Sequence, residues 1–208
     1  MRHLHWFQQD LRLKDNPALR SHAAADSLLC VYLMPRPKPW CNTVGLGPQR
    51  DRFLRESLVA LQSELQALGQ NLMVLEGSPE LVLPDLVAKF GITEISLTRC
   101  HGYHEAKSLE FLERKLEIPI SVHRGNTLFE PEDFPFELQD IPGVFSPFRR
   151  RVESLNINKP LAVPEYLPPP PAAQYDDIPP SLHGRHPALP LPGGPAAAER
   201  RLHQFIEV

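Results

Sequence analysis

Two short polar runs, residues 8–12 and 98–105, hold the side chains of this sequence that could bind a ligand or do chemistry. In the first run, Asp10 and Arg12 place opposite charges in a single turn. Two interpretations stay open for this pair. The two side chains contact a ligand or a partner domain, or they form an internal ion pair that makes the turn rigid.

The second polar run contains His101, Tyr103 and His104, which could suggest a metal site. Their spacing matches no familiar zinc pattern, and no nearby Cys/His pair completes a ligand set. No Ser-His-Asp pattern, HExxH motif or paired catalytic carboxylate stands out in the sequence. We therefore expect no metal centre and no catalytic residues in this chain.

Apolar runs and helical periodicities alternate regularly through the first 125 residues. The clearest helix has a leucine at every third or fourth position from Leu54 to Leu68, and Gly69 ends it. Strands are expected over 2–8, 28–33, 71–76, 94–98 and 120–123, and helices over 16–25, 48–68, 78–90 and 103–116. Because parallel strands need crossover connections, this order predicts an α/β fold, with a five-stranded parallel Rossmann-like sheet and helices on both faces.

The predicted sheet places both polar runs at one edge. Ligands of such sheets bind beyond the carboxyl ends of the strands, near the point where the strand order reverses. The runs 8–12 and 98–105 follow the first and fourth expected strands. The sequence contains neither G-x-G-x-x-G nor G-x-x-x-x-G-K-[ST], so an ordinary dinucleotide site or P-loop is not expected.

The bulk composition suits one domain of ordinary size with an appendage. The chain has 208 residues, 42% of them hydrophobic, and a net charge of −3, which argues against DNA binding by this chain alone. Three cysteines without CxxC spacing fit a reducing cytoplasm, and Cys30 is expected in the core with Trp6 and Phe7. No apolar stretch approaches the ~20 residues that span a bilayer, so a soluble cytoplasmic protein is expected.

Proline divides the chain, because 12 of the 24 prolines fall between residues 160 and 195. We predict an α/β domain over 1–155 and a Pro-rich interdomain linker over 156–194, extended as a semi-rigid tether. Residues 195–208 are expected to begin a truncated helical domain. Ser146 is expected to cap a short helix, with Arg149–Arg151 near its N-terminal end, where cations are mildly unfavourable.

Several segments in order resemble the photolyase/cryptochrome family, and most of all its DASH branch. The opening run 5–19 (HWFQQDLRLKDNPAL) has the family's strand, Asp-Leu-Arg turn and helix capped by Asp15–Asn16, with Pro17 in its first turn. Similar family segments occur at 47–57 (GPQRDRFLRES), 126–129 (NTLF) and 144–153 (VFSPFRRRVE), and Gly193–Gly194 resembles the entry to the helical domain. The resemblance covers nearly the whole chain, but Gln8 stands where the family usually has Arg.

The resemblance implies a chromophore site at the second polar run. In folate-binding members, a Glu at the start of the helix after the fourth strand hydrogen-bonds the pterin of methenyltetrahydrofolate, and Glu105 matches that position. A carboxylate can accept two parallel N–H bonds from an aminopyrimidinone edge. The alternative is that Glu105 only complements the positive end of its helix. The resemblance also places His104, Asp10 and Gln8 as candidate cofactor-binding residues.

The resemblance further implies the α/β domain and linker of a two-domain flavoprotein. The family's helical domain binds FAD, docks DNA and repairs pyrimidine dimers with light, or serves blue-light reception. We therefore expect a domain that holds an antenna chromophore and docks the helical FAD domain, with no repair activity, FAD or DNA binding of its own and no membrane contact. Exposed apolar area makes weak homo-oligomers plausible. The alternative function is a stand-alone nucleotide-binding or protein-interaction module.

Overall fold

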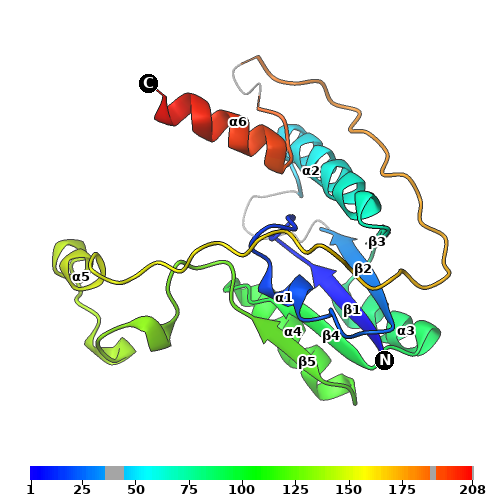
Figure 1. Cartoon of the computed structure of the whole chain (residues 1–208), viewed down its shortest axis with the longest axis horizontal. Coiled ribbons are helices and arrows are strands. Elements are labelled where there is room, and N and C mark those ends of the chain that lie inside the picture. Colours follow the sequence, from blue (N-terminus) through cyan, green and yellow to red (C-terminus); the bar gives the residue numbers. More distant parts are fainter. Residues whose placement is uncertain (36–44, 188–190, 208) are drawn as a thin grey trace.

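Five parallel strands form one sheet in the computed structural model, which describes residues 1–35, 45–187 and 191–207 (Figure 1). The strand order is β3-β2-β1-β4-β5, and every neighbouring pair is parallel. The strands are β1 (Arg2–Phe7), β2 (Ser27–Met34), β3 (Leu72–Glu76), β4 (Glu94–Thr98) and β5 (Ile120–His123). The predicted five-stranded parallel α/β fold is confirmed. Trp40 and Cys41 lie outside the described residues.

Helices pack on both faces of the sheet. The helices are α1 (Pro17–Arg20), α2 (Pro48–Ala67), α3 (Pro79–Phe90), α4 (Tyr103–Lys115), α5 (Phe145–Val152) and α6 (Pro195–Ile206), with 3-10 turns at Pro131–Asp133 and Leu138–Asp140. Helices α3 and α4 pack on one face, while α2 covers the β2–β3 side of the other face and α1 its β4–β5 side. In the described residues, no helix has both the length and the apolar character needed to cross a membrane.

Alternate residues of the central strands enter two separate cores, as the two-residue period of a strand requires. Trp6 packs with the side chains of α3 and α4, whereas Phe7 and Cys30 pack with the leucines of α2. All three side chains are buried, as predicted. Burial also raises the pKa of the Cys30 thiol, so this cysteine is an inert core residue.

Two helix boundaries differ from the sequence prediction. The helix expected over 16–25 ends at Arg20, and turns complete the segment. Helix α5 begins at Phe145 after an N-cap at Val144, so Ser146 is not its cap. The prediction that Arg149–Arg151 lie near the N-terminal end of this helix was therefore wrong, because these arginines lie in its last turn. Cations at a helix C-terminus complement the macrodipole.

The proline-rich segment packs against the α/β body and is not a free tether. It runs without helix or strand from residue 156 to 187 and around the α2 side of the molecule (Figure 1). Leu167 and Ile178 are buried in the core beneath α2. The Leu28 amide donates to the Pro169 carbonyl at 3.0 Å, and the Gln70 side chain donates to the Pro168 carbonyl at 2.6 Å. These contacts explain why a segment without repetitive structure keeps a defined path.

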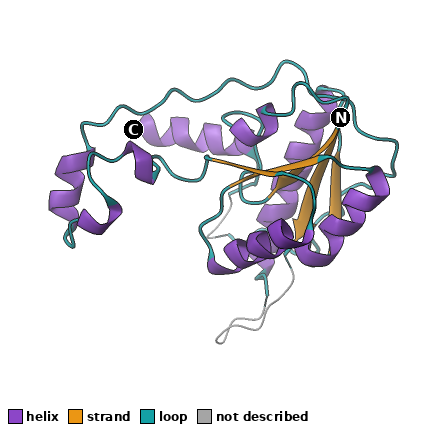
Figure 2. Cartoon of the chain, turned by 90° about the horizontal axis from the view of Figure 1, so that it is seen from below, coloured by secondary structure: helices purple, strands orange, loops and turns teal. Residues whose placement is uncertain are grey.

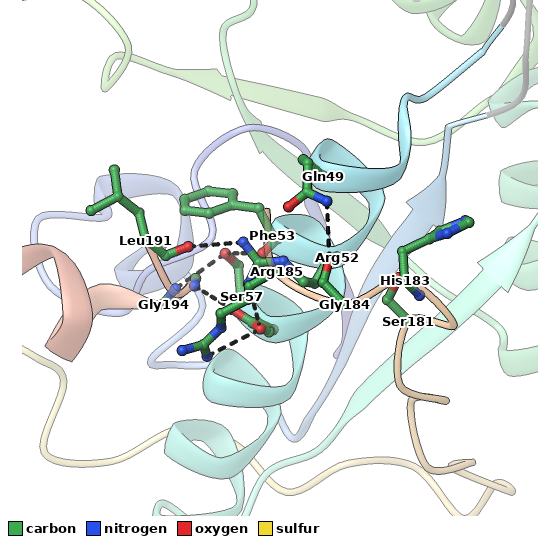
Figure 3. Close-up of polar contacts among 12 residues, drawn as sticks. Gln49, Arg52, Phe53, Ser57, Ser181, His183, Gly184, Arg185, Leu191 and Gly194 are labelled. Carbon is green, nitrogen blue, oxygen red and sulfur yellow. Dashed lines mark hydrogen bonds and ion pairs between the residues drawn. The ribbon is translucent and has the colours of Figure 1, made fainter. Parts of the chain in front are cut away.

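The end of this segment lies along the first half of α2 (Figure 3). Arg52 donates to the Leu191 carbonyl at 3.1 Å, and the Gly193 and Gly194 amides donate to Glu56 at 2.7 Å and to Ser57 at 3.2 Å. The approach is close enough that a Cβ on Gly193 would lie 2.8 Å from the Ser57 nitrogen. Only glycine fits between these backbones.

Two helices extend beyond the compact body. Figures 1 and 2 place α5 well away from the sheet, and α6 exposes its apolar side chains, including Leu202, Phe205 and Ile206. An ion pair at 3.7 Å between Lys14, which follows the first polar run, and Glu199 ties α6 to the α/β body. Whether α6 is stable in solution or mediates self-association stays a prediction.

Gly193→Ala should detach the segment 191–194 from α2, because the new methyl group meets backbone atoms that cannot move aside. We expect a loss of about 1–3 kcal/mol of stability and faster amide exchange at Gly194. Gly184→Ala is the matched control, since a Cβ there meets no atom within 4 Å. Equal amide exchange and equal stability in the two variants would contradict the close approach at Gly193.

Candidate functional site

The two polar runs meet at the carboxyl edge of the sheet. Strands β1 and β4 are hydrogen-bonded neighbours, with His3 opposite Glu94 and His5 opposite Ser96. The chain passes from β1 to β2 on one side and returns through β4 on the other, so the strand order reverses between β1 and β4. Ligands of open α/β sheets bind outside such a reversal point. The predicted location of the two runs is confirmed.

Asp10 holds this edge together from inside the protein. Its side chain is buried, and its Oδ1 accepts the Gln8 amide at 3.0 Å. Its Oδ2 accepts from the Asn16 side chain at 3.2 Å and from the Thr98 hydroxyl at 2.6 Å. Asn16 in turn accepts the Leu19 amide at 2.9 Å and so caps α1. The Asp10 carboxylate therefore joins β1, α1 and β4, and no free oxygen face is left toward solvent.

Arg12 does not pair with Asp10, so the internal ion pair considered for the first turn is not formed. Its guanidinium lies 4.0 Å from the Asp15 carboxylate and donates to the Asp15 carbonyl at 3.1 Å and to the Gly125 carbonyl at 2.9 Å. A Cβ on Gly125 would lie 2.9 Å from the Thr98 methyl group. Arg12 thus stiffens the turn by holding the chain that leaves β5.

Glu105 lies in the first turn of α4, whose N-cap is Gly102. The side chain is half-buried and folds back toward the N-cap, filling the space that a side chain at Gly102 would need. This position suits a carboxylate, because the N-terminal end of a helix is positive. Among the described residues, its oxygens accept no hydrogen bond. Both interpretations of Glu105 fit this geometry, and its acceptor capacity is unused.

Cys100 and Asn126 complete the site, and the sequence did not single them out as site residues. The Asn126 amide donates to the Arg99 carbonyl at 2.8 Å and contacts the Cys100 sulfur at 3.5 Å. Burial, together with the nearby charges of Asp10 and Glu105, raises the pKa of the Cys100 thiol to about 11. The Cys100 thiol belongs to the second polar run, and with this raised pKa it stays protonated at neutral pH. The position of Cys100 depends on its contact with Asn126, which lies 26 residues later in the chain, and no local sequence pattern indicates such a contact.

The remaining candidates line the open side of this edge. His104 is exposed, and its ring lies edge-on to Tyr103 at 5.5 Å between centroids. Gln8 is half-buried; its backbone amide donates to Asp10, and its side chain makes no hydrogen bond in the part of the chain that the structure describes. Within residues 1–35, 45–187 and 191–207, no group of three or more His, Cys, Asp or Glu side chains is arranged so that it could hold a metal ion. The polar edge formed by Gln8, Cys100, His104, Glu105 and Asn126 is the candidate site.

A second concave region lies farther along the same edge of the sheet. A hollow of about 640 Å³ opens between the ends of β2 and β3, the start of α2 and the proline-rich segment. Asp51, Arg55 and His183 contribute its polar lining. The Arg55 guanidinium and the Ser181 hydroxyl hold the pKa of the Asp51 carboxyl below its usual value, against the opposing effect of burial. The Asp51 carboxylate is already paired with Arg55 and Ser181, unlike the Glu105 carboxylate.

The fold and its polar edge define a parallel α/β domain with polar side chains at the point where the strand order reverses. The model of the DNA photolyase family matches residues 3–171, and the chain belongs to this family. Cryptochrome DASH of Gloeobacter violaceus is 37% identical over 186 residues, which cover 84% of this chain and 36% of that relative. Cryptochrome DASH of Idiomarina loihiensis is 36% identical and covers 73% of this chain. The chain spans about a third of the length of these relatives.

Solved structures agree with this placement. A cryptochrome from Synechocystis sp. PCC6803 superposes with a TM-score of 0.86 and 28% identity, over 97% of this chain and 45% of that one. A class III photolyase from Agrobacterium tumefaciens gives a TM-score of 0.70 at 26% identity, over 84% of this chain and 36% of that one. The chain therefore corresponds to the N-terminal α/β domain of photolyases and cryptochromes, and it is similar in sequence to cryptochromes of the DASH branch.

Asp10→Asn should destabilise the protein by about 2–3 kcal/mol, because an amide cannot accept from all three donors that surround Asp10. The variant has the same shape, so its effect measures hydrogen bonding and charge instead of packing. Urea unfolding measures the loss, with Asp85→Asn on the exposed face of α3 as the control. A midpoint equal to that of the control would show that Asp10 does not hold the edge together.

Proposed function

We propose that this chain is the antenna-side α/β domain of a DASH-type cryptochrome or photolyase. In this proposal, the polar edge between β1 and β4 holds a pterin chromophore, methenyltetrahydrofolate. The domain also docks the helical domain that binds FAD in the family. The observation that carries the proposal is the Glu105 carboxylate, which lies at the reversal point of the sheet and accepts no hydrogen bond from the residues that the structure describes.

The donor chemistry of a pterin matches this carboxylate. An aminopyrimidinone edge presents two N–H groups side by side, and one carboxylate can accept both. The exposed His104 ring next to Glu105 offers a surface for the flat pterin. Asp10 has no such role, because its oxygens are already occupied. It supports the site by fixing the turn that carries Gln8.

The bound chromophore supplies light absorption, and in the family its energy passes to reduced FAD. This chain's own residues do the binding and orientation, while flavin carries the hard chemistry. We place FAD and DNA in the helical domain, where a damaged base would be flipped out of the duplex. A net charge of −3 gives this chain no attraction of its own for DNA.

Exposed apolar side chains outside the sheet support a docking surface for that helical partner. Phe145 on α5 is 71% exposed and Phe205 on α6 is 77% exposed, and both helices stand away from the core (Figures 1 and 2). Large side chains of this kind are costly to leave in water, and contiguous exposed patches mark interaction sites. In a preparation of this chain alone, the same surface would favour weak self-association.

Glu105→Gln should weaken methenyltetrahydrofolate binding by about tenfold to a hundredfold, because hydrogen bonds to a charged acceptor are lost. Titration of the purified chain, followed by the near-ultraviolet pterin band, measures the affinity. Glu113→Gln is the matched control, an exposed glutamate on the same helix.

Three results would contradict the proposal. Equal affinity in Glu105→Gln and Glu113→Gln would remove Glu105 from the site. No saturable pterin binding by the folded chain would favour a stand-alone interaction module, and tight FAD binding by the chain would contradict the assignment of FAD to the helical domain.

A further inference from the structure

Four histidines converge beneath α1, on the face of the sheet opposite α3 and α4. His3 and His5 project from β1, His22 follows α1, and His123 ends β5. The rings of His3 and His22 lie 5.2 Å apart, and those of His5 and His22 lie 5.8 Å apart. His5 and His22 are fully buried. No step in the proposed chromophore binding uses this cluster.

Ser96 fixes the protonation of the cluster through its hydroxyl group. The hydroxyl has one hydrogen, and it must go to the Ala18 carbonyl at 3.1 Å, which can only accept. The Nδ1 of His5, at 2.9 Å, and the Nε2 of His22 must then both donate to the Ser96 oxygen. His22 is left with a bare Nδ1, which accepts from the Nδ1 of His3 at 3.0 Å. All three rings take part in this network as neutral tautomers, and the bare Nε2 of His5 is left without a partner in the described residues.

A proton added to either buried ring disturbs this network. On His5 it would occupy Nε2, a buried atom that has no partner in the described residues. On His22 it would occupy Nδ1 and point at the N–H of His3. Burial, with a smaller contribution from the neighbouring histidines, lowers the pKa of His5 to about 4 and that of His22 to about 2.

The nearby acidic groups do not remove this conflict. Asp10 favours a charge on His5, but less strongly than burial opposes it. Glu94 lies 3.7 Å from the Nε2 of His3. Glu94 also favours a charge on His123, but burial has the larger effect and lowers the pKa of His123. Asp26 is exposed and pairs with the N-terminal ammonium. No carboxylate accepts a hydrogen bond from His5 or His22 in the described residues.

We propose that the histidine cluster is a proton-operated latch, in which neutral rings hold α1 on the sheet and protonation in mild acid releases it. Ser96 donates to the backbone of α1 itself, and His22 lies directly beyond the last turn of that helix. Release of α1 withdraws Asn16, which donates to Asp10 at 3.2 Å. The latch therefore links acidity to the order of the candidate site. It requires no chromophore.

The expected pH window follows from the direction of these shifts. The folded-state pKa values of His5 and His22 lie below the unfolded value of 6.5, so on acidification the unfolded chain binds protons that the folded chain does not. The stabilisation is complete above pH 6.5 and is lost as the pH falls below it. For each buried neutral ring, acidification below pH 6.5 raises the unfolding constant by up to about tenfold per pH unit, which amounts to roughly 30-fold at pH 5. Carboxylates such as Asp51 and Glu56, with lowered pKa values, act below this range.

Urea unfolding of the full chain between pH 5 and pH 8 tests the latch. His22→Gln removes one titrating ring, while the glutamine amide can still donate to Ser96. The unfolding constant of this variant should change roughly 30-fold less over this pH range than that of the natural chain. The control is His203→Gln, an exposed histidine on α6, which should keep the full pH dependence. If His22→Gln does not fold, His5→Gln provides the same comparison.

Two measurements on the unaltered chain make the proposal falsifiable without any variant. Nitrogen-15 spectra of the histidine rings should show His5 and His22 neutral in the folded protein at pH 5.5. Amide protection, corrected for the intrinsic exchange rate, should fall in α1 before it falls in α2 as the pH drops to 5. Protonated rings in the intact fold, a flat unfolding constant between pH 7 and pH 5, or equal loss of protection in α1 and α2 would overturn the latch.

Discussion

The buried carboxylate of Asp10 is the interaction on which the candidate site depends. It accepts hydrogen bonds from the backbone after β1, from Asn16 at the start of α1 and from Thr98 at the end of β4. A buried charge is stable only when such donors surround it, so the three elements cannot separate without a large cost. The exposed polar groups, Glu105 among them, can therefore remain available to a ligand, because other residues stabilise this edge of the sheet.

Much of the fold was predictable because burial imposes local patterns. Apolar runs gave all five strands, and the leucine spacing gave α2 to within one residue of its observed end. The helix expected over 16–25 ends early, since the buried polar contacts of His22 bend the chain beneath the helix. Likewise, the path of the segment 156–187 rests on single hydrogen bonds to distant strands, and composition does not encode them.

The candidate site was predictable in place but not in the roles of its residues. The topology of parallel strands located both polar runs at one edge. Asp10 and Arg12 lie two residues apart in one turn, yet they bind different partners, because Asn16 and Thr98 already hydrogen-bond to the Asp10 carboxylate. Cys100 and the histidine cluster depend on contacts between β1, β4 and β5. A sequence pattern holds no information on such contacts until the strand order is known.

The most direct test of this account is a titration of the nitrogen-15-labelled chain with methenyltetrahydrofolate, followed by amide chemical shifts. The account predicts saturable shifts confined to the edge between β1 and β4, in residues 8–12, 99–105 and 125–126. The hollow between α2 and the proline-rich segment, lined in part by Asp51 and His183, is the alternative location. Shifts centred there, or no shifts anywhere, would contradict the assignment of the polar edge as the chromophore site.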